Sequence, residues 1–290
     1  MDTVFVVGNG FDIDLGLKSK YSDFAASNKW PFSSVYGVYS SPLAKYLDYH
    51  KEVDKWLELE DLLGKYAYSA YAKGGSSLKK DKADFNRLKL SLSKYLNDIS
   101  QEPTIDYNSA AAKLITRISK KGPFESSFYS FNYTEPRSYV ANCKRSVSHV
   151  HGALSKDNII LGFGDNVEDV GDYNCMRKSF SSKYKPPRII DELMNCRKAV
   201  FFGLSMGEVD YAYFDHFFEA ISNPENLKRD LLGKEVYFFT YDEHSRDEIL
   251  RNLFIKTKHR LSNLRTLNTI KVITTSDTDP SEISNIINSI

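Results

Sequence analysis

Residues that could do chemistry first gather where an apolar run ends near the start of the chain. The run "TVFVV" (3–7) is uniformly apolar and is followed at once by Gly8, Asn9 and Gly10. Glycines after a strand let the backbone turn sharply and let a ligand approach closely, and the start of a following helix favours a phosphate. The spacing matches neither the GxGxxG fingerprint nor a P-loop, so the alternative is a tight turn without a ligand.

Polar residues also follow a second strand-like run, "SSFYSFNY" (126–133). Asn132 stands near its end, and a polar residue at the carboxyl end of a strand in an α/β sheet faces the crevice where ligands bind. Thr134 suits the N-cap of a following helix, which leaves Asn132 available to a ligand. Asn132 is therefore a candidate ligand-binding residue.

The motif "SHVHGAL" contains His149 and His151, which alternate with Val150. This alternation places both histidines on the same face of a strand. A metal site needs more ligands than these two, and the sequence offers no obvious third. Because imidazole titrates near neutrality, His151 is a candidate general acid or base, and the alternative is a hydrogen-bonded structural histidine.

A fourth motif, "VFFGLSMGEVDYAYFDHFF" (200–218), repeats the order of strand, glycine, small hydroxyl and helix start. In this arrangement Gly203 and Ser205 could contact a ribose or a phosphate. One alternative is an ordinary helix with Ser205 as its N-cap. Another is a nucleophile elbow of the GxSxG type, which would need a histidine partner.

Composition limits the class of protein. The chain has 290 residues, of which 41% are hydrophobic and 27% charged, so it can bury a full core. Its net charge of +1 provides no long-range attraction to nucleic acid or to an acidic membrane. Three widely spaced cysteines indicate a reducing compartment, and no apolar run approaches the ~18–20 residues that cross a bilayer, so we expect a cytoplasmic protein. Its 19 tyrosines and 18 phenylalanines suit either a core or an interface in a homo-oligomer.

Apolar runs typical of buried parallel strands alternate with helical patterns. Strands are expected at 3–7, 126–133, 146–152, 158–164, 198–205, 235–241 and 269–275, and helices at 21–27, 42–72, 81–100, 187–196, 208–222 and 243–258. The segment 165–186 lacks periodicity and is expected to be mostly loop. The alternation predicts an α/β fold with a Rossmann-like, mainly parallel sheet in one domain over 1–290, with a helical insertion over 42–120.

Taken in order, the motifs resemble the AbiH family of bacterial abortive-infection proteins, which protect against bacteriophage. The similar stretches are "VVGNGFDIDLGLKSKYSDF", "WLELEDLL", "SFNYTEP", "HVHG", "LGFG" and "FFGLSMGEVDYAYF". The resemblance thus extends from the first strand to about residue 220. The chain departs from the family at Leu204, where members usually carry a histidine.

The AbiH family is in turn similar to sirtuin-type NAD-binding proteins, which implies a sirtuin-like fold and a set of residue roles. Asn132 matches the sirtuin asparagine after a strand, and His151 matches the catalytic histidine before a glycine. The cofactor-binding residues implied are Gly8, Asn9, Gly10, Phe11, Asp23 and Phe24 near the first turn, and Gly203, Ser205 and Asp210 in the fourth motif. Sirtuin deacetylases also carry a zinc module with paired CxxC, which this sequence lacks, and no metal is predicted.

The leading hypothesis is that the protein binds NAD or a related nucleotide, as substrate or ligand, and hydrolyses its N-glycosidic bond. Asn132 would position a water, His151 would act as a base, and Asp12 would stabilise oxocarbenium charge. One alternative is a nucleotide-binding sensor or assembly module without turnover, acting with a phage-derived trigger or partner protein. Another is a metal-dependent nuclease using Asp12 and Asp14, which the near-zero net charge disfavours.

Overall fold

The computed structural model describes residues 2–290 except 35, 37, 54–58, 121, 123–124, 136–145 and 229–230. Trp56 and Glu58 of the predicted helix, and Cys143, lie outside the described residues. The chain divides into two compact units. The sheet unit comprises Met1–Leu17, Thr104–Val150 and Pro186–Ile290, and the helical unit comprises Lys18–Pro103 and His151–Lys185.

A six-stranded sheet forms the centre of the sheet unit, with the strand order β3-β2-β1-β4-β5-β6. The strands are β1 (Thr3–Val7), β2 (Ser126–Ser130), β3 (Ser148–His149), β4 (Lys198–Phe202), β5 (Glu235–Thr240) and β6 (Thr269–Thr274). All neighbouring strands are parallel, so the prediction of a Rossmann-like parallel sheet is confirmed. The strand order reverses between β1 and β4, and open α/β sheets bind ligands beyond the carboxyl ends of the strands at such a point.

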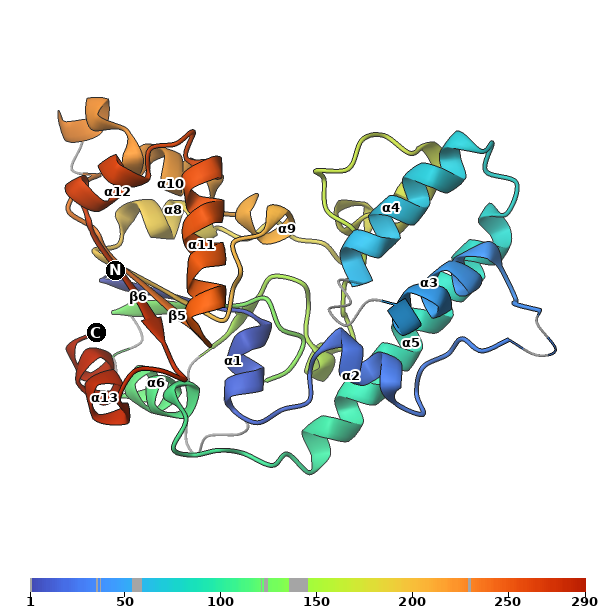
Figure 1. The fold of residues 1–290 in the computed structure, drawn as a ribbon, viewed down its shortest axis with the longest axis horizontal. Helices are drawn as coiled ribbons and strands as arrows, with labels where there is room; N and C mark the ends of the chain where they lie inside the picture. Colours follow the sequence, from blue (N-terminus) through green and yellow to red (C-terminus); the bar gives the residue numbers. More distant parts are fainter. Residues whose placement is uncertain are drawn as a thin grey trace. The chain divides into compact units, whose positions relative to one another are not determined.

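Helices cover both faces of this sheet, and its side chains alternate between them. The helices are α1 (Asn9–Asp14), α6 (Ala110–Ser119), α8 (Ile189–Asn195), α9 (Glu208–Tyr211), α10 (Asp215–Ser222), α11 (Glu243–Lys256), α12 (Leu261–Leu267) and α13 (Pro280–Ser289). Phe5 and Val7 join a core with α1, α6 and α13, whereas Val4 and Val6 join a core with α8 to α12. Figure 1 shows α6 and α13 on one side of β5 and β6, and α11 and α12 on the other. Burial on both faces explains why β1 is an uninterrupted apolar run.

Two of the predicted strands differ in the structure. Of the run 146–152, only Ser148–His149 forms a strand, at the edge of the sheet. The predicted strand 158–164 is wrong, because this segment forms only an isolated bridge between Phe163 and Arg177. A Cβ on Gly162 would lie 2.1 Å from the carbonyl oxygen of Met176, so this backbone packs closely against the end of the 3₁₀ helix η2 (Gly171–Met176). The run is apolar because it is buried there, and it has no sheet to join.

The helical unit is built from α2 (Tyr21–Ala26), α3 (Pro42–Val53), α4 (Leu59–Ala72) and α5 (Leu78–Gln101). Asp81 of α5 is fully buried among them. Its carboxylate accepts hydrogen bonds from the Leu43 amide at 3.1 Å and from the hydroxyls of Tyr66, Ser77 and Tyr173 at 2.7, 2.6 and 2.8 Å. One carboxylate therefore joins α3, α4, α5 and the 3₁₀ helix η2 (Gly171–Met176). The helix α6, within the range predicted as a helical insertion, belongs to the sheet unit.

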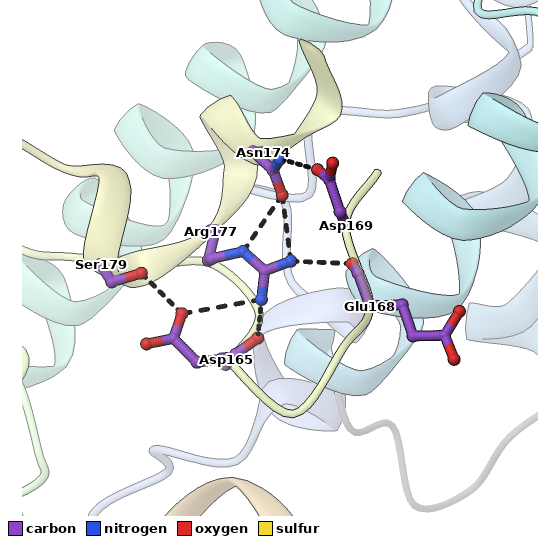
Figure 2. A network of polar contacts seen from close by, with 7 residues as sticks. Asp165, Glu168, Asp169, Asn174, Arg177 and Ser179 are labelled. Atoms are coloured by element: carbon purple, nitrogen blue, oxygen red, sulfur yellow. Dashed lines mark hydrogen bonds and ion pairs between the residues drawn. The ribbon is translucent and has the colours of Figure 1, made fainter. Parts of the chain in front are cut away.

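Arg177 organises the aperiodic segment of the helical unit, as Figure 2 shows. Its buried guanidinium donates to the carbonyls of Gly164 and Glu168 at 2.8 and 2.9 Å, and to Asn174 Oδ1 at 3.0 and 3.1 Å. Asp165 lies 3.6 Å from the same guanidinium. The segment is mostly loop, as predicted, with η2 and a second 3₁₀ helix, η3 (Lys178–Phe180). The Arg177 side chain thus donates hydrogen bonds to backbone carbonyls that, in a helix or strand, would accept from backbone amides.

Candidate functional site

Glycines allow the turn after β1 and the turn after β4 to pack on each other. A Cβ on Gly10 would lie 2.6 Å from the Cα of Gly203, and a Cβ on Gly203 would lie 2.3 Å from the Phe11 nitrogen. Gly203 also has a φ of +67°, which residues with a side chain rarely adopt. Leu204 is buried against Gly8. The glycines that the sequence singled out are therefore required by close packing at the point where the strand order reverses.

Two amides of the first turn are engaged within the fold. The Gly8 amide donates to the Phe202 carbonyl at 2.9 Å, and the Gly10 amide donates to the Gly203 carbonyl at 3.0 Å. Both acceptors belong to β4 or to the turn that follows it. A ligand at this turn would therefore have to use other groups than these two amides.

The remaining cofactor-binding candidates of the two turns differ in exposure. Asn9 and Ser205 are exposed, Asp210 of α9 is half-buried, and Phe11 is fully buried. The Phe11 ring belongs to the core, with its centroid 5.2 Å from that of Phe202. In the part of the chain that the structure describes, no histidine hydrogen-bonds the Ser205 hydroxyl, the partner that a nucleophile elbow would need.

Asp12, Asn132 and Thr134 form a buried cluster at the carboxyl ends of β1 and β2. Asn132 Nδ2 donates to Asp12 Oδ1 and to the Gly8 carbonyl, both at 2.9 Å. The Thr134 hydroxyl donates to Asp12 Oδ2 at 2.5 Å. Because the Gly8 carbonyl can only accept, the Asn132 nitrogen must face it, and this fixes the orientation of the carboxamide. Among the described residues, Asn132 Oδ1 has no hydrogen-bond partner.

Burial raises the pKa of Asp12 from its ordinary value of 3.8 to about 6. The hydrogen bonds from Thr134 and Asn132 favour the carboxylate and lower the pKa, but the loss of hydration is the larger effect. Asp12 can therefore exchange a proton close to physiological pH. Both oxygens of Asp12 accept hydrogen bonds, one from Asn132 and one from Thr134, so Asp12 positions these two side chains.

His149 extends this cluster, in a role that the sequence did not indicate. Its Nδ1 donates to the Asn132 carbonyl at 2.9 Å, and its Nε2 lies 3.2 Å from Glu135 Oε1. Because a carbonyl can only accept, Nδ1 carries a proton in this arrangement. The ring thus links β3 to the segment after β2 that carries Asn132.

His151 belongs to the helical unit, where its ring contacts Lys178. Lys178 Nζ lies 3.3 Å from both ring nitrogens and donates to Glu60 Oε2 at 2.7 Å. His151 and Lys178 are only 4% and 3% exposed, so the contact is buried. The sequence singled out His151 but missed Lys178, which stands in the aperiodic segment. Glu60 lies in "WLELEDLL", one of the stretches that carry the resemblance to the AbiH family.

Three other predicted residues make contacts that serve the fold. Asp23 accepts a hydrogen bond from the Lys20 amide at 3.3 Å at the start of α2. Phe24 is fully buried in the helical unit. Asp14, which the nuclease hypothesis requires, accepts from the Ala111 amide at 2.8 Å in the sheet unit.

The described side chains form neither a metal site nor an activated thiol. Within the described residues, no group of three or more His, Cys, Asp or Glu side chains could hold a metal ion. Burial raises the pKa of the Cys175 thiol, and raises that of Cys196 to about 11, so neither is an activated nucleophile. None of the helices in the described residues combines the length and apolar character needed to cross a membrane.

A parallel sheet in this strand order, with helices on both faces and polar side chains at its carboxyl edge, defines a Rossmann-like α/β protein. The chain belongs to the AbiH family, because the family model "Bacteriophage abortive infection AbiH" matches residues 4–228. Its role is therefore in bacteriophage abortive infection, and the resemblance of its motifs to the AbiH family is confirmed. A search of curated proteins found no match for the chain.

Proposed function

We propose that the protein binds NAD or a related nucleotide and hydrolyses its N-glycosidic bond. The observation that carries the proposal is the buried Asp12–Asn132 pair, which leaves Asn132 Oδ1 unpaired among the described residues. The strand order supports it, since sheets of this order bind dinucleotides where the order reverses. The similarity of the motifs to sirtuin-type proteins points to the same ligand.

Hydrolysis replaces the bond between ribose C1′ and the nicotinamide nitrogen with a bond between C1′ and a water oxygen. The electron pair of the broken bond goes to nicotinamide, and the water gives up one proton. In the proposed role, Asn132 Oδ1 accepts a hydrogen bond from the attacking water and orients it. Asp12 holds the carboxamide in place and, when ionised, supplies negative charge that favours an oxocarbenium-like transition state.

The resemblance to sirtuin-type proteins makes His151, of the helical unit, the proposed general base of the reaction. A neutral imidazole is the side chain best suited to this step near neutral pH. Asn9 and Ser205, both exposed at the ends of their turns, are the proposed contacts to the phosphates and ribose of the cofactor. Gly8, Gly10 and Gly203 contribute by allowing the two turns to pack closely.

Incubation of the purified protein with NAD, followed by chromatography, tests the proposal. The expected products are ADP-ribose and nicotinamide. Asn132→Ala and His151→Ala should each lower the rate about 100-fold or more. His216→Ala, at an exposed histidine of the sheet unit, is the matched control and should leave the rate unchanged.

The outcomes distinguish the hypotheses. Intact NAD that raises the unfolding temperature of the protein would support the sensor or assembly module in place of the hydrolase. The proposal would be overturned if the protein neither turned over NAD nor changed its unfolding temperature when NAD was added. Turnover at the wild-type rate in His151→Ala would remove His151 from the mechanism while leaving the activity established.

A further inference from the structure

We propose that His149 is a positioning residue for Asn132, and that it acts by holding the main chain from which the Asn132 carboxamide extends. Its Nδ1 lies 2.9 Å from the Asn132 carbonyl oxygen, and its side chain is only 3% exposed. His149 stands on β3 and Asn132 follows β2, so this hydrogen bond joins two neighbouring strands of the sheet unit. The consequence for catalysis rests on the proposed function, whereas the positioning itself does not.

The register of the two strands places His149 where its side chain can reach Asn132. His149 pairs with Ser130, the last residue of β2. The ladder continues with a hydrogen bond from the Val150 amide to the Ser130 carbonyl at 2.9 Å. Asn132 lies two residues past the end of β2, and its carbonyl accepts from the side chain of the neighbouring strand. The His149 ring therefore extends the contact between β2 and β3 beyond their backbone hydrogen bonds.

A buried serine closes a local turn at Asn132. The Asn132 amide donates to Ser130 Oγ at 3.1 Å, and the Ser130 hydroxyl donates to the Asn132 carbonyl at 3.3 Å. Such a turn fixes two neighbouring residues relative to each other, but both belong to the same segment of chain. His149 is 17 residues away in the sequence, so its hydrogen bond ties this turn to the adjacent strand.

The carboxamide of Asn132 is held at its other end. Its Nδ2 donates to Asp12 Oδ1 and to the Gly8 carbonyl, both at 2.9 Å. With the main chain held by Ser130 and His149, the direction of Asn132 Oδ1 is fixed before a ligand arrives. A displacement of about 1 Å in a positioned group can lower a reaction rate about 100-fold. Loss of the His149 hydrogen bond should therefore affect a reaction that uses Oδ1.

The position of the donating atom provides a matched pair of variants. A single carbon separates Nδ1 of histidine from Cβ, and the same is true of Nδ2 of asparagine. Nε2 of histidine is one atom further out, as is Nε2 of glutamine. His149→Asn therefore keeps a donor near the Asn132 carbonyl. His149→Gln places its donor near the other ring nitrogen, which lies 3.2 Å from Glu135 Oε1.

NMR of the full chain tests the positioning without a ligand. The Asn132 carboxamide signals are assigned by their loss in Asn132→Ala. In His149→Gln these signals should shift, and their protons should exchange with water roughly tenfold faster, as expected for the loss of one hydrogen bond. In His149→Asn they should stay close to the wild type. Carboxamide signals that do not respond to His149→Gln would overturn the proposal.

The wild-type ring decides the question if neither variant folds. The His149 ring signals are then assigned through their couplings to the His149 backbone. Nδ1 should carry a proton at neutral pH, because a carbonyl can only accept a hydrogen bond. An Nδ1 without a proton would overturn the proposal.

Turnover of NAD measures the consequence for catalysis. His149→Gln should lower kcat by about 10- to 100-fold and change KM by less than about twofold, because His149 holds Asn132 and not the ligand. His149→Asn should recover most of the lost rate. An equal loss in the two variants, or no loss in either, would overturn the effect on catalysis. Absence of turnover in the wild type would refute the proposed function and leave the NMR result standing.

Discussion

Asp12 of the sheet unit and Asp81 of the helical unit are both buried aspartates, but their surroundings differ. Asp12 accepts side-chain hydrogen bonds from Asn132 and Thr134. Asp81 accepts from one backbone amide and three hydroxyls. Burial raises the pKa of Asp12 to about 6, so its two partners do not replace the hydration that it loses.

Asp12 can therefore exchange a proton near neutral pH, and the hydrogen bonds to Asp81 join separate helices. Of the two oxygens of Asp81, Oδ2 accepts from the three hydroxyls and Oδ1 accepts from the Leu43 amide. Burial and the neighbouring Asp81 also raise the pKa of Tyr66, which keeps its hydroxyl protonated as a donor. At Asp12, by contrast, one of the two partners is Asn132, itself a candidate functional residue.

The largest effect on stability is expected at Asp81. Asp81→Ala removes the acceptor of a buried amide, of two buried tyrosine hydroxyls and of the half-buried Ser77 hydroxyl. This should cost more than about 3 kcal/mol of unfolding free energy. Hydrogen exchange in α3, α4 and α5 measures the loss. Asp98→Ala, at an exposed aspartate, is the control and should change stability by less than about 0.5 kcal/mol. Equal effects of the two substitutions would contradict the structural role of Asp81.

Asp12 should instead make stability depend on pH. Its pKa is about 6 in the folded protein and near 3.8 when unfolded, so the folded protein binds this proton more tightly. Stability from this group is therefore present below about pH 4 and is lost as pH rises through 6, by up to about 3 kcal/mol.

Asp12→Asn should remove this term. Denaturant unfolding of both proteins at pH 4 and pH 7 gives the difference in unfolding free energy, in which the other titrating groups cancel. That difference should change with pH by about 2–3 kcal/mol in favour of the variant at pH 7. A constant difference would mean that Asp12 titrates normally.

A smaller, local effect is expected at Arg177. Arg177→Met removes the donors to the carbonyls of Gly164 and Glu168, and should cost about 2 kcal/mol and open the segment around them to proteolysis. Ser179→Ala, which removes an exposed hydrogen bond to Asp165 in the same network, is the matched control. Cleavage at equal rates in both variants would show that Arg177 does not hold the loop.

The smallest effect is expected at Asp23, and it distinguishes a cap from a cofactor contact. Asp23→Ala removes the acceptor for the Lys20 amide and should cost about 1 kcal/mol. If the resemblance to sirtuins also holds at this residue, the KM for NAD should rise as well. Unfolding and turnover measured on the same preparation separate the two roles.

Strands buried on both faces are the part of the fold that the sequence predicts best. β1 has the predicted bounds, because a central parallel strand is apolar without interruption. The run 158–164 shows the limit, since burial under a loop produces the same apolar pattern. The helix α12 has seven residues, too few for a clear period, whereas α13 begins with the start signal Asp279–Pro280 and could have been predicted.

The sequence by itself determined the α/β class, the family and the position of Asn132 after a strand, because these follow from local patterns and their order along the chain. Only the tertiary structure decided what each side chain contacts. It engages the amides of Gly8 and Gly10 within the fold, pairs Asp12 with Asn132, and places Lys178 beside His151. These contacts join segments far apart in the chain, as with Glu60 and Lys178 at a separation of 118 residues, and no local pattern encodes them.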